Sequence, residues 1–166
     1  MKKGFYPALG TPSDQFGNFM ADSFEKQVRD QITAGASGLL AMGSMGIEPC
    51  IKQSEYKKVA VSSVNAAKGE CPVLVGVMDN SIGRVLDRIE CLKGLNIDGV
   101  VATTPYYFVS TQEELKSFFT EIAKASPFPL YLYDLPGVTK VKINVDTVEY
   151  LMNIDNIKGI KTGDRK

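Results

Sequence analysis

The 166-residue sequence contains neither histidine nor tryptophan. A chain without histidine cannot build Ser-His-Asp or Cys-His catalysis, a histidine metal site or the usual proton shuttle near pH 7. Any acid–base chemistry must therefore be carried out by tyrosine, lysine, glutamate or aspartate side chains.

A net charge is absent as well, because 19 lysine and arginine residues balance 19 aspartate and glutamate residues. A neutral chain has no electrostatic attraction for nucleic acid or an anionic membrane, so neither partner is expected. The cysteines are few: Cys50, Cys71 and Cys91 form no CxxC pair. A chain of this size needs no disulfides, so we expect reduced thiols and no metal site.

The N-terminal sequence MKKGFYPALGTPSD lacks a long apolar run. Its apolar stretch is short and interrupted by Pro7, which neither a signal peptide nor a membrane helix would tolerate. We therefore expect a cytoplasmic protein. The length suits one sizeable core rather than two, so a single domain is expected over residues 1–166.

Short apolar runs alternate with longer segments in which apolar residues recur at i, i+3, i+4 and i+7. The runs occupy residues 5–12, 38–44, 71–78, 97–105, 129–136 and 157–163. A repeat of about 30 residues is the size of a βαβ unit, which predicts an α/β fold with about six parallel strands and five helices. Asp22, Ser81 and Thr111 stand where helix N-caps are expected.

Two architectures fit this alternation, a doubly wound sheet and a (β/α)8 TIM barrel. The doubly wound sheet would gain from a GxGxxG motif or P-loop after the first run, and ALGTPSDQFG contains neither. Polar or tyrosine side chains gather at the C-terminal end of most predicted strands: Thr11, Ser44, Asp79, Thr103, Thr104, Tyr133 and Lys161. In a barrel these strand ends meet at one mouth, where such folds place their chemistry. We therefore favour a TIM barrel, truncated here because six of eight strands are predicted.

Lys161 ends the run IKGIK and is the first candidate for chemistry. An ordinary lysine at a strand end extends its ammonium group into water. If Ile160 faces the helices, however, Lys161 points into the barrel. Loss of hydration there favours the neutral amine, which is a nucleophile toward carbonyl groups. The position therefore indicates Schiff-base chemistry.

Tyr133 is the second candidate and lies in the stretch LYLYDLPG. A tyrosine there is ordinarily a core aromatic. Strand alternation nevertheless places Tyr131 and Tyr133 on one face, with Tyr133 nearer the mouth. A phenol at that position can relay protons in a protein that has no histidine.

Two loops give weaker indications. In AMGSMGIEP, two glycines flank Ser44 and Met45, so backbone N–H groups and the serine hydroxyl can form a small anion nest that suits a carboxylate. An ordinary βα loop is the simpler interpretation. In TTPYYF, the adjacent Tyr106 and Tyr107 cannot both point into one mouth, so one is expected to face a neighbouring element or another subunit.

Five stretches together resemble the family of dihydrodipicolinate synthase and N-acetylneuraminate lyase. They are ALGTP, GSMG, VATTPYY, YLYDLPG and GIKTGD, in this order and spacing, and they extend from residue 8 to residue 164. The resemblance implies a (β/α)8 barrel and a class I aldolase that binds or releases pyruvate through a lysine Schiff base. It implies a keto acid and an aldehyde as partners, and no cofactor.

The resemblance also implies a role for each candidate residue. Lys161 would form the Schiff base, and Tyr133 would donate and accept protons above it. The turn of Ser44 and Met45 would hold the pyruvate carboxylate. Tyr107 would reach into the site of the neighbouring subunit in a homodimer or homotetramer.

The sequence departs from the family pattern at several positions. Met45 replaces a second hydroxyl residue, Asp134 stands where asparagine is common, and Val138 stands where the synthases have an arginine. Family members also continue for two further strands. We therefore expect a gene fragment, a partial sequence or a frameshifted product that forms a single incomplete barrel domain.

These observations leave three hypotheses for function. The first is a class I aldolase or lyase that acts on pyruvate or a 2-keto-3-deoxy acid, with a neutral aldehyde because Val138 offers no donor to a second carboxylate. The alternative is 4-hydroxy-tetrahydrodipicolinate synthase of lysine biosynthesis, which uses aspartate semialdehyde. The third is an inactive fragment or scaffold that lacks the last two barrel strands.

Overall fold

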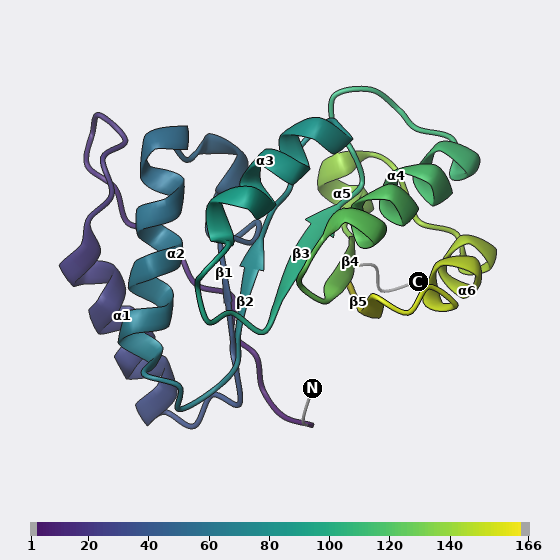
Figure 1. The fold of residues 1–166 in the computed structure, drawn as a ribbon. Helices are drawn as coiled ribbons and strands as arrows, with labels where there is room; N and C mark the ends of the chain where they lie inside the picture. The colour runs from purple at the N-terminus through teal and green to yellow at the C-terminus, as the bar shows by residue number, and fades with distance from the viewer. Residues whose placement is uncertain (1–2, 164–166) are drawn as a thin grey trace. The chain divides into compact units, whose positions relative to one another are not determined.

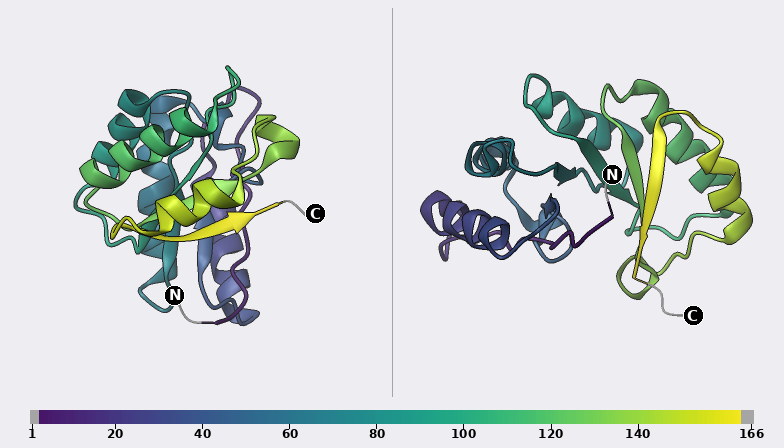
Figure 2. Two further views of the ribbon diagram at one scale, coloured as in Figure 1. Left: turned by 90° about the vertical axis from the view of Figure 1, so that its right-hand side faces the viewer. Right: turned by 90° about the horizontal axis from the view of Figure 1, so that it is seen from below.

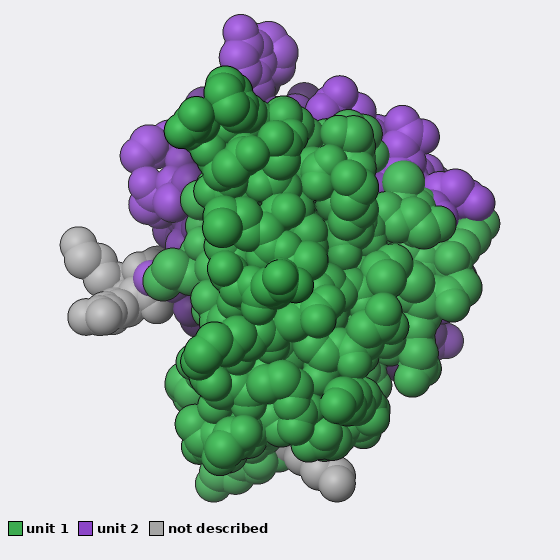
Figure 3. All heavy atoms as spheres, turned by 90° about the vertical axis from the view of Figure 1, so that its left-hand side faces the viewer, with its two compact units in different colours: residues 1–76, 91–98 green, residues 77–90, 99–166 purple. Residues whose placement is uncertain are grey.

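The computed structural model describes residues 3–163 of the chain (Figures 1 and 2). Helices and strands alternate along the described residues, with five strands and six α-helices among them. The chain divides into two compact units, each of which is described by itself (Figure 3). Unit 1 comprises residues 1–76 and 91–98, and unit 2 comprises residues 77–90 and 99–166.

Unit 1 contains two short parallel strands and two long helices. Its elements are α1 (Ala21–Thr33), β1 (Leu39–Ala41), the 3-10 helix η1 (Glu48–Cys50), α2 (Gln53–Ala67) and β2 (Val73–Gly76). β1 pairs with β2 so that Leu40 lies opposite Leu74. Every residue of both strands is buried, as expected for continuous apolar runs in parallel strands. α1 and α2 pack side by side (Figure 1).

The first apolar run, residues 5–12, forms a single bridge instead of a strand. Ala8 pairs with Leu40, Leu9 N–H donates to the Leu40 carbonyl at 2.9 Å, and Leu40 N–H donates to the Pro7 carbonyl at 3.0 Å. Proline has no N–H to give to a ladder, so Pro7 and Pro12 limit the pairing of this run. The described chain therefore has five strands where six runs are predicted.

Unit 2 contains three parallel strands and most of the remaining helices. Its elements are β3 (Gly99–Thr103), α4 (Gln112–Ala125), β4 (Leu130–Asp134), α5 (Pro136–Thr139), α6 (Val145–Met152) and β5 (Ile157–Thr162). α3 (Ile82–Leu92) begins in unit 2 and its last two residues belong to unit 1. β4 pairs with β3 on one side and with β5 on the other. α6 packs against both α4 and β5 (Figure 2).

The helix starts follow the predicted caps at two of three positions. Thr111 caps α4 in a capping box, with Glu114 N–H donating to the threonine hydroxyl and the Glu114 carboxylate accepting from Thr111 N–H. Ser81 precedes α3, and its hydroxyl accepts from Arg84 N–H at 3.4 Å. The prediction for Asp22 is wrong, because α1 starts after Met20 and Asp22 lies within its first turn. A first-turn carboxylate interacts with the helix dipole rather than capping the end.

Within residues 3–163, no helix combines the length and the apolar composition that crossing a bilayer requires.

Candidate active site

Lys161 and Tyr133 are neighbours on adjacent strands of unit 2. β4 and β5 pair in parallel with Tyr133 opposite Lys161, and side chains of such partners project from the same face. Lys161 Nζ lies 3.7 Å from the centroid of the Tyr133 ring, which is a cation–π geometry. Regular strand pairing thus brings together the two side chains predicted to carry out the chemistry.

The two side chains differ in exposure. Tyr133 is only 3% exposed, whereas Lys161 is exposed. The expectation that Lys161 points into the interior of a barrel stays a prediction. β5 is the last strand within residues 3–163, so no further described strand covers the side chains at its outer edge.

Thr103 extends the same row onto β3. It lies opposite Tyr133 in the β3–β4 register and is 3% exposed. Its hydroxyl has no hydrogen-bond partner within residues 3–163, and neither has the hydroxyl of the adjacent Thr104. Buried hydroxyl groups are usually hydrogen-bonded, so two orphans at one strand end are unusual. The row Thr103, Tyr133, Lys161 therefore presents three polar groups on three neighbouring strands.

Asp134 joins the two strands just beyond this pair. Its carbonyl accepts a hydrogen bond from Gly163 N–H at 2.8 Å. Its carboxylate accepts from Ile143 N–H at 3.0 Å and from the Thr162 hydroxyl at 3.3 Å. Asp134 is 4% exposed. The sequence analysis noted Asp134 as a departure from the family pattern but did not assign it these contacts.

Tyr107 lies in the exposed loop after β3, together with Phe108. Both rings are 77% exposed and they meet edge to face with centroids 4.8 Å apart. Asn80 holds the base of this loop, because its side-chain oxygen accepts from Tyr106 N–H at 2.9 Å and from Tyr107 N–H at 2.8 Å. The sequence analysis missed Asn80, although its position two residues after the predicted run 71–78 was available as an indication.

An ion cluster lies next to Asn80. Asp79 is buried and accepts hydrogen bonds from Arg84 Nε at 2.7 Å and from Arg88 Nη2 at 2.9 Å. Tyr106 is half-buried, and this burial, reinforced by the negative charge of Asp79, raises the pKa of its phenol. The cluster anchors the segment that carries Asn80, which in turn anchors the loop of Tyr107.

Ser44 and Met45 lie in unit 1, in the loop between β1 and η1, and both are exposed. Lys161, Tyr133 and Tyr107 lie in unit 2. The role of Ser44 and Met45 in holding a carboxylate therefore stays a prediction.

The shape of this loop depends on glycine and on unusual backbone angles. A Cβ atom at Gly46 would lie 3.0 Å from the Leu9 carbonyl oxygen and 3.0 Å from Met42 Cα. Met42 and Ile47 adopt left-handed conformations with φ of 53° and 47°, which are uncommon for such side chains. The loop is thus held in one conformation by its surroundings rather than by a regular hydrogen-bond ladder.

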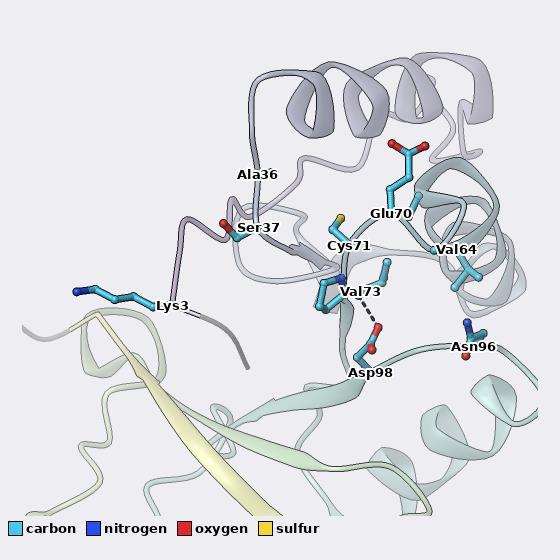
Figure 4. Close-up of a pocket in the computed structure, with 12 residues that line it drawn as sticks. Lys3, Ala36, Ser37, Val64, Glu70, Cys71, Val73, Asn96 and Asp98 are labelled. Atoms are coloured by element: carbon cyan, nitrogen blue, oxygen red, sulfur yellow. Dashed lines mark hydrogen bonds between the residues drawn. The ribbon is translucent and has the colours of Figure 1, made fainter.

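A pocket of about 740 Å³ lies in unit 1, and none of the predicted site residues lines it (Figure 4). Its polar lining includes Ser37, Cys71 and Asp98. The Asp98 carboxylate accepts from Val73 N–H at 2.8 Å, and burial raises the pKa of the Cys71 thiol. The volume of this pocket therefore does not identify it as the predicted site. The pair Tyr133 and Lys161 is placed instead by the pairing of β4 with β5.

Parallel strands joined by helices define an α/β protein. The sequence model of the Dihydrodipicolinate synthetase family matches residues 1–166, and the chain belongs to this family. The predicted family membership is thus confirmed.

Two curated relatives are 4-hydroxy-tetrahydrodipicolinate synthases. The protein from Bartonella bacilliformis is 35% identical over 162 residues, which are 97% of this chain and 55% of that protein. The protein from Gluconacetobacter diazotrophicus is 32% identical over 161 residues, which are 97% of this chain and 54% of that protein. The chain therefore spans about half the length of these relatives.

A solved structure confirms the fold. Dihydrodipicolinate synthase from Acinetobacter baumannii, crystallised with pyruvate, is 33% identical and superposes with a TM-score of 0.91 over 96% of this chain and 55% of that protein. The chain thus has the fold of part of a TIM barrel, as predicted.

Proposed function

We propose that the protein to which this chain belongs is a class I aldolase that binds pyruvate as a Schiff base on Lys161. The observation that carries the proposal is the position of Lys161 Nζ, 3.7 Å from the centroid of the Tyr133 ring on the next strand. A pyruvate complex of a related synthase supports the choice of keto acid.

Each side chain has a distinct role in this chemistry. The neutral amine of Lys161 attacks the keto carbon of pyruvate, and the resulting carbinolamine loses water to give the imine. The Tyr133 hydroxyl belongs to the ring beneath the amine, so it can transfer protons to and from the departing oxygen. Loss of a proton from the imine then gives a carbon nucleophile that adds to an aldehyde.

The comparisons support the synthase reaction better than sugar-acid cleavage. Both curated relatives are 4-hydroxy-tetrahydrodipicolinate synthases, so aspartate semialdehyde is the first candidate for the aldehyde. Lysine biosynthesis is the corresponding setting.

One observation favours a neutral aldehyde as a second candidate. Val138 is 62% exposed and offers no donor. The nearby Lys140 donates its ammonium group to the Gly137 carbonyl at 2.9 Å. A substrate carboxylate would lack a bidentate partner there, at a cost of about 1–3 kcal/mol. Assays with pyruvate plus aspartate semialdehyde or glyceraldehyde, in a protein extended to the length of the relatives, distinguish the two candidates.

We further propose that the full-length protein is a homodimer or homotetramer. The exposed rings of Tyr107 and Phe108 support this, because aromatic side chains of this exposure commonly become buried in interfaces. Tyr107 would then reach the site of the neighbouring subunit.

Borohydride trapping tests the proposed function. The 166-residue chain is incubated with pyruvate and borohydride and then weighed by mass spectrometry. We expect an irreversible gain of one reduced pyruvate adduct, absent in Lys161→Ala. A chain that gains no mass would support the third hypothesis, an inactive fragment or scaffold.

A further inference from the structure

Asp134 forms hydrogen bonds next to Tyr133 and Lys161, the pair proposed to carry out the chemistry. Its carbonyl accepts from Gly163 N–H, and its carboxylate accepts from Thr162 and from Ile143 N–H. Thr162 directly follows Lys161, and Asp134 directly follows Tyr133. One residue therefore fixes the chain immediately after both members of the pair.

The register of β4 and β5 shows why such a link matters. The two strands shift register between Leu130 and Tyr131, and from there the pairing continues to Asp134 opposite Thr162. Lys161 thus lies next to the end of its strand, where pairing is easily frayed. The carboxylate of Asp134 supplements the backbone ladder at this end.

The carboxylate also fixes the segment that follows β4. Ile143 is 3% exposed, and its N–H donates to Asp134. Residues 135–142, which include α5, lie between the two partners, so this hydrogen bond holds the far end of that segment next to the end of β4. Without it, a buried N–H would lose its partner and the end of β4 would lose a constraint.

A buried aspartate is a costly way to make these contacts. No ion-pair partner of Asp134 occurs within residues 3–163, and a buried carboxylate without a cation is unfavourable unless it is hydrogen-bonded. The hydrogen bonds from Ile143 and Thr162 provide that compensation. A side chain with the same shape and two hydrogen-bonding atoms, such as asparagine, should therefore replace it.

We infer that Asp134 is a positioning residue that holds Lys161 Nζ over the Tyr133 ring by tying the end of β5 to the end of β4. The inference rests on the proposed function for its chemical consequence, but its geometric part stands on the hydrogen bonds alone. Asp134 directly follows Tyr133 in β4, so its side chain projects from the opposite face of the sheet. It acts through the two strands and not by touching the substrate.

Asn156 offers a matched control at the opposite end of β5. Its side-chain amide donates to the carbonyls of Ala123, Ser126 and Phe128 at 2.8, 3.0 and 3.1 Å. Asn156→Ala therefore also removes hydrogen bonds that anchor β5, but before the strand begins. A purely structural role for Asp134 predicts the same result for both alanine variants.

The experiment measures geometry and chemistry separately in wild type, Asp134→Ala, Asp134→Asn and Asn156→Ala. NMR reports the ring-current shift of the Lys161 ε-methylene protons, which is upfield when they lie over the Tyr133 ring. Borohydride trapping reports the rate of imine formation at saturating pyruvate. Denaturant titration establishes that each variant is folded under the assay conditions.

We expect Asp134→Ala to lose the upfield shift and to form the imine about 10- to 100-fold more slowly, since small misplacements of reacting groups have effects of this size. Asp134→Asn should stay within about threefold of wild type, because its amide oxygen can accept from Ile143 N–H and its NH2 group can donate to the Thr162 hydroxyl. Asn156→Ala should lose stability but keep the shift and the rate.

Other outcomes overturn either this inference or the proposed function. Retention of the shift in Asp134→Ala, or its equal loss in Asn156→Ala, would overturn the positioning role. If folded Asp134→Asn behaves like Asp134→Ala, the negative charge of Asp134 is what matters, and the positioning role through hydrogen bonds is overturned. If wild type forms no imine but Asp134→Ala alone loses the shift, the proposed function fails and the geometric inference stands.

Discussion

Units 1 and 2 place their candidate residues by different means. In unit 2, Tyr133 and Lys161 belong to paired strands, and their positions follow from the β4–β5 register. In unit 1, Ser44 and Met45 belong to a loop whose course depends on Gly46 and on left-handed residues. In paired strands, the regular hydrogen-bond ladder determines which side chains lie opposite each other. In a loop, each side chain is placed by its own set of contacts.

The difference determines how each unit should respond to substitution. In unit 2, a change at a strand-end side chain should alter chemistry while the fold persists. In unit 1, a change at a small backbone position should alter the fold of the loop and, through it, the stability of the unit. The predictions below test this contrast, from the largest expected effect to the smallest.

Tyr133→Phe should give the largest effect on unit 2. The ring beneath Lys161 Nζ remains, so the fold and some imine formation should persist, but the hydroxyl that we propose to transfer protons is lost. Turnover should fall by roughly 100-fold or more, as is typical when a positioned acid–base group is removed. The measurement is kcat in a protein extended to the length of the relatives. Unchanged turnover would exclude Tyr133 from the mechanism.

Gly46→Ala should give the largest effect on unit 1. The new Cβ would meet the Leu9 carbonyl oxygen and the Met42 backbone at 3.0 Å, so the loop must shift at a cost of about 1–3 kcal/mol in the free energy of unfolding. Gly83→Ala is the control, because nothing lies within 4 Å of a Cβ there. Because Gly83 lies in helix α3, replacing it with alanine should raise the free energy of unfolding by about 0.5 kcal/mol. Equal changes in the free energy of unfolding for Gly46→Ala and Gly83→Ala, measured in urea titrations, would contradict the claim that close contacts at Gly46 determine the course of the loop.

The sequence predicts the regular part of this fold better than its exceptions. Apolar runs at a repeat of about 30 residues locate all five strands, and alternation places Tyr131 and Tyr133 on one face. The position of Lys161 at the end of its run makes it a candidate, and the family resemblance implies the same role. The first run, residues 5–12, forms a single bridge instead of a strand because Pro7 and Pro12 lack N–H donors.

Side-chain contacts between distant segments could not be predicted in the same way. The hydrogen bonds of Asn80 to the loop of Tyr107, and of Asp134 to Ile143, join positions 9 to 27 residues apart. Neither follows from periodicity, because both depend on how a loop returns to a strand end. The exposure of Lys161 likewise depends on which strands lie beyond β5, and not on the local sequence.

Thr111→Ala should have a moderate effect on unit 2. The threonine hydroxyl caps α4 in a capping box, and loss of such a cap typically reduces the free energy of unfolding by about 1 kcal/mol. Met20→Ala is the matched change in unit 1, because Met20 makes no side-chain capping bond at the start of α1. Its effect should stay within about 0.5 kcal/mol. Equal losses in chemical denaturation would show that the capping box contributes nothing.

The same capping box should make stability weakly dependent on pH. Hydrogen bonds from the backbone N–H and hydroxyl of Thr111 lower the pKa of the Glu114 carboxyl below its usual value. The stabilisation is therefore fully present above that value and is lost as pH falls through the lower pKa of the folded state. Glu114→Gln should remove this part of the acid dependence in unfolding curves. If Glu114→Gln leaves the dependence of the unfolding free energy on pH unchanged, Glu114 does not contribute to it.

The most direct measurement of the central claim is the location of the trapped pyruvate adduct within the chain. Lys158 and Lys161 are both exposed and lie on the same strand, but only Lys161 lies over the Tyr133 ring. Peptide mapping after borohydride reduction should find the adduct on Lys161, and Lys158→Ala should not reduce its yield. An adduct on Lys158, or one distributed equally among the exposed lysines, would contradict the claim that strand register creates the reactive lysine.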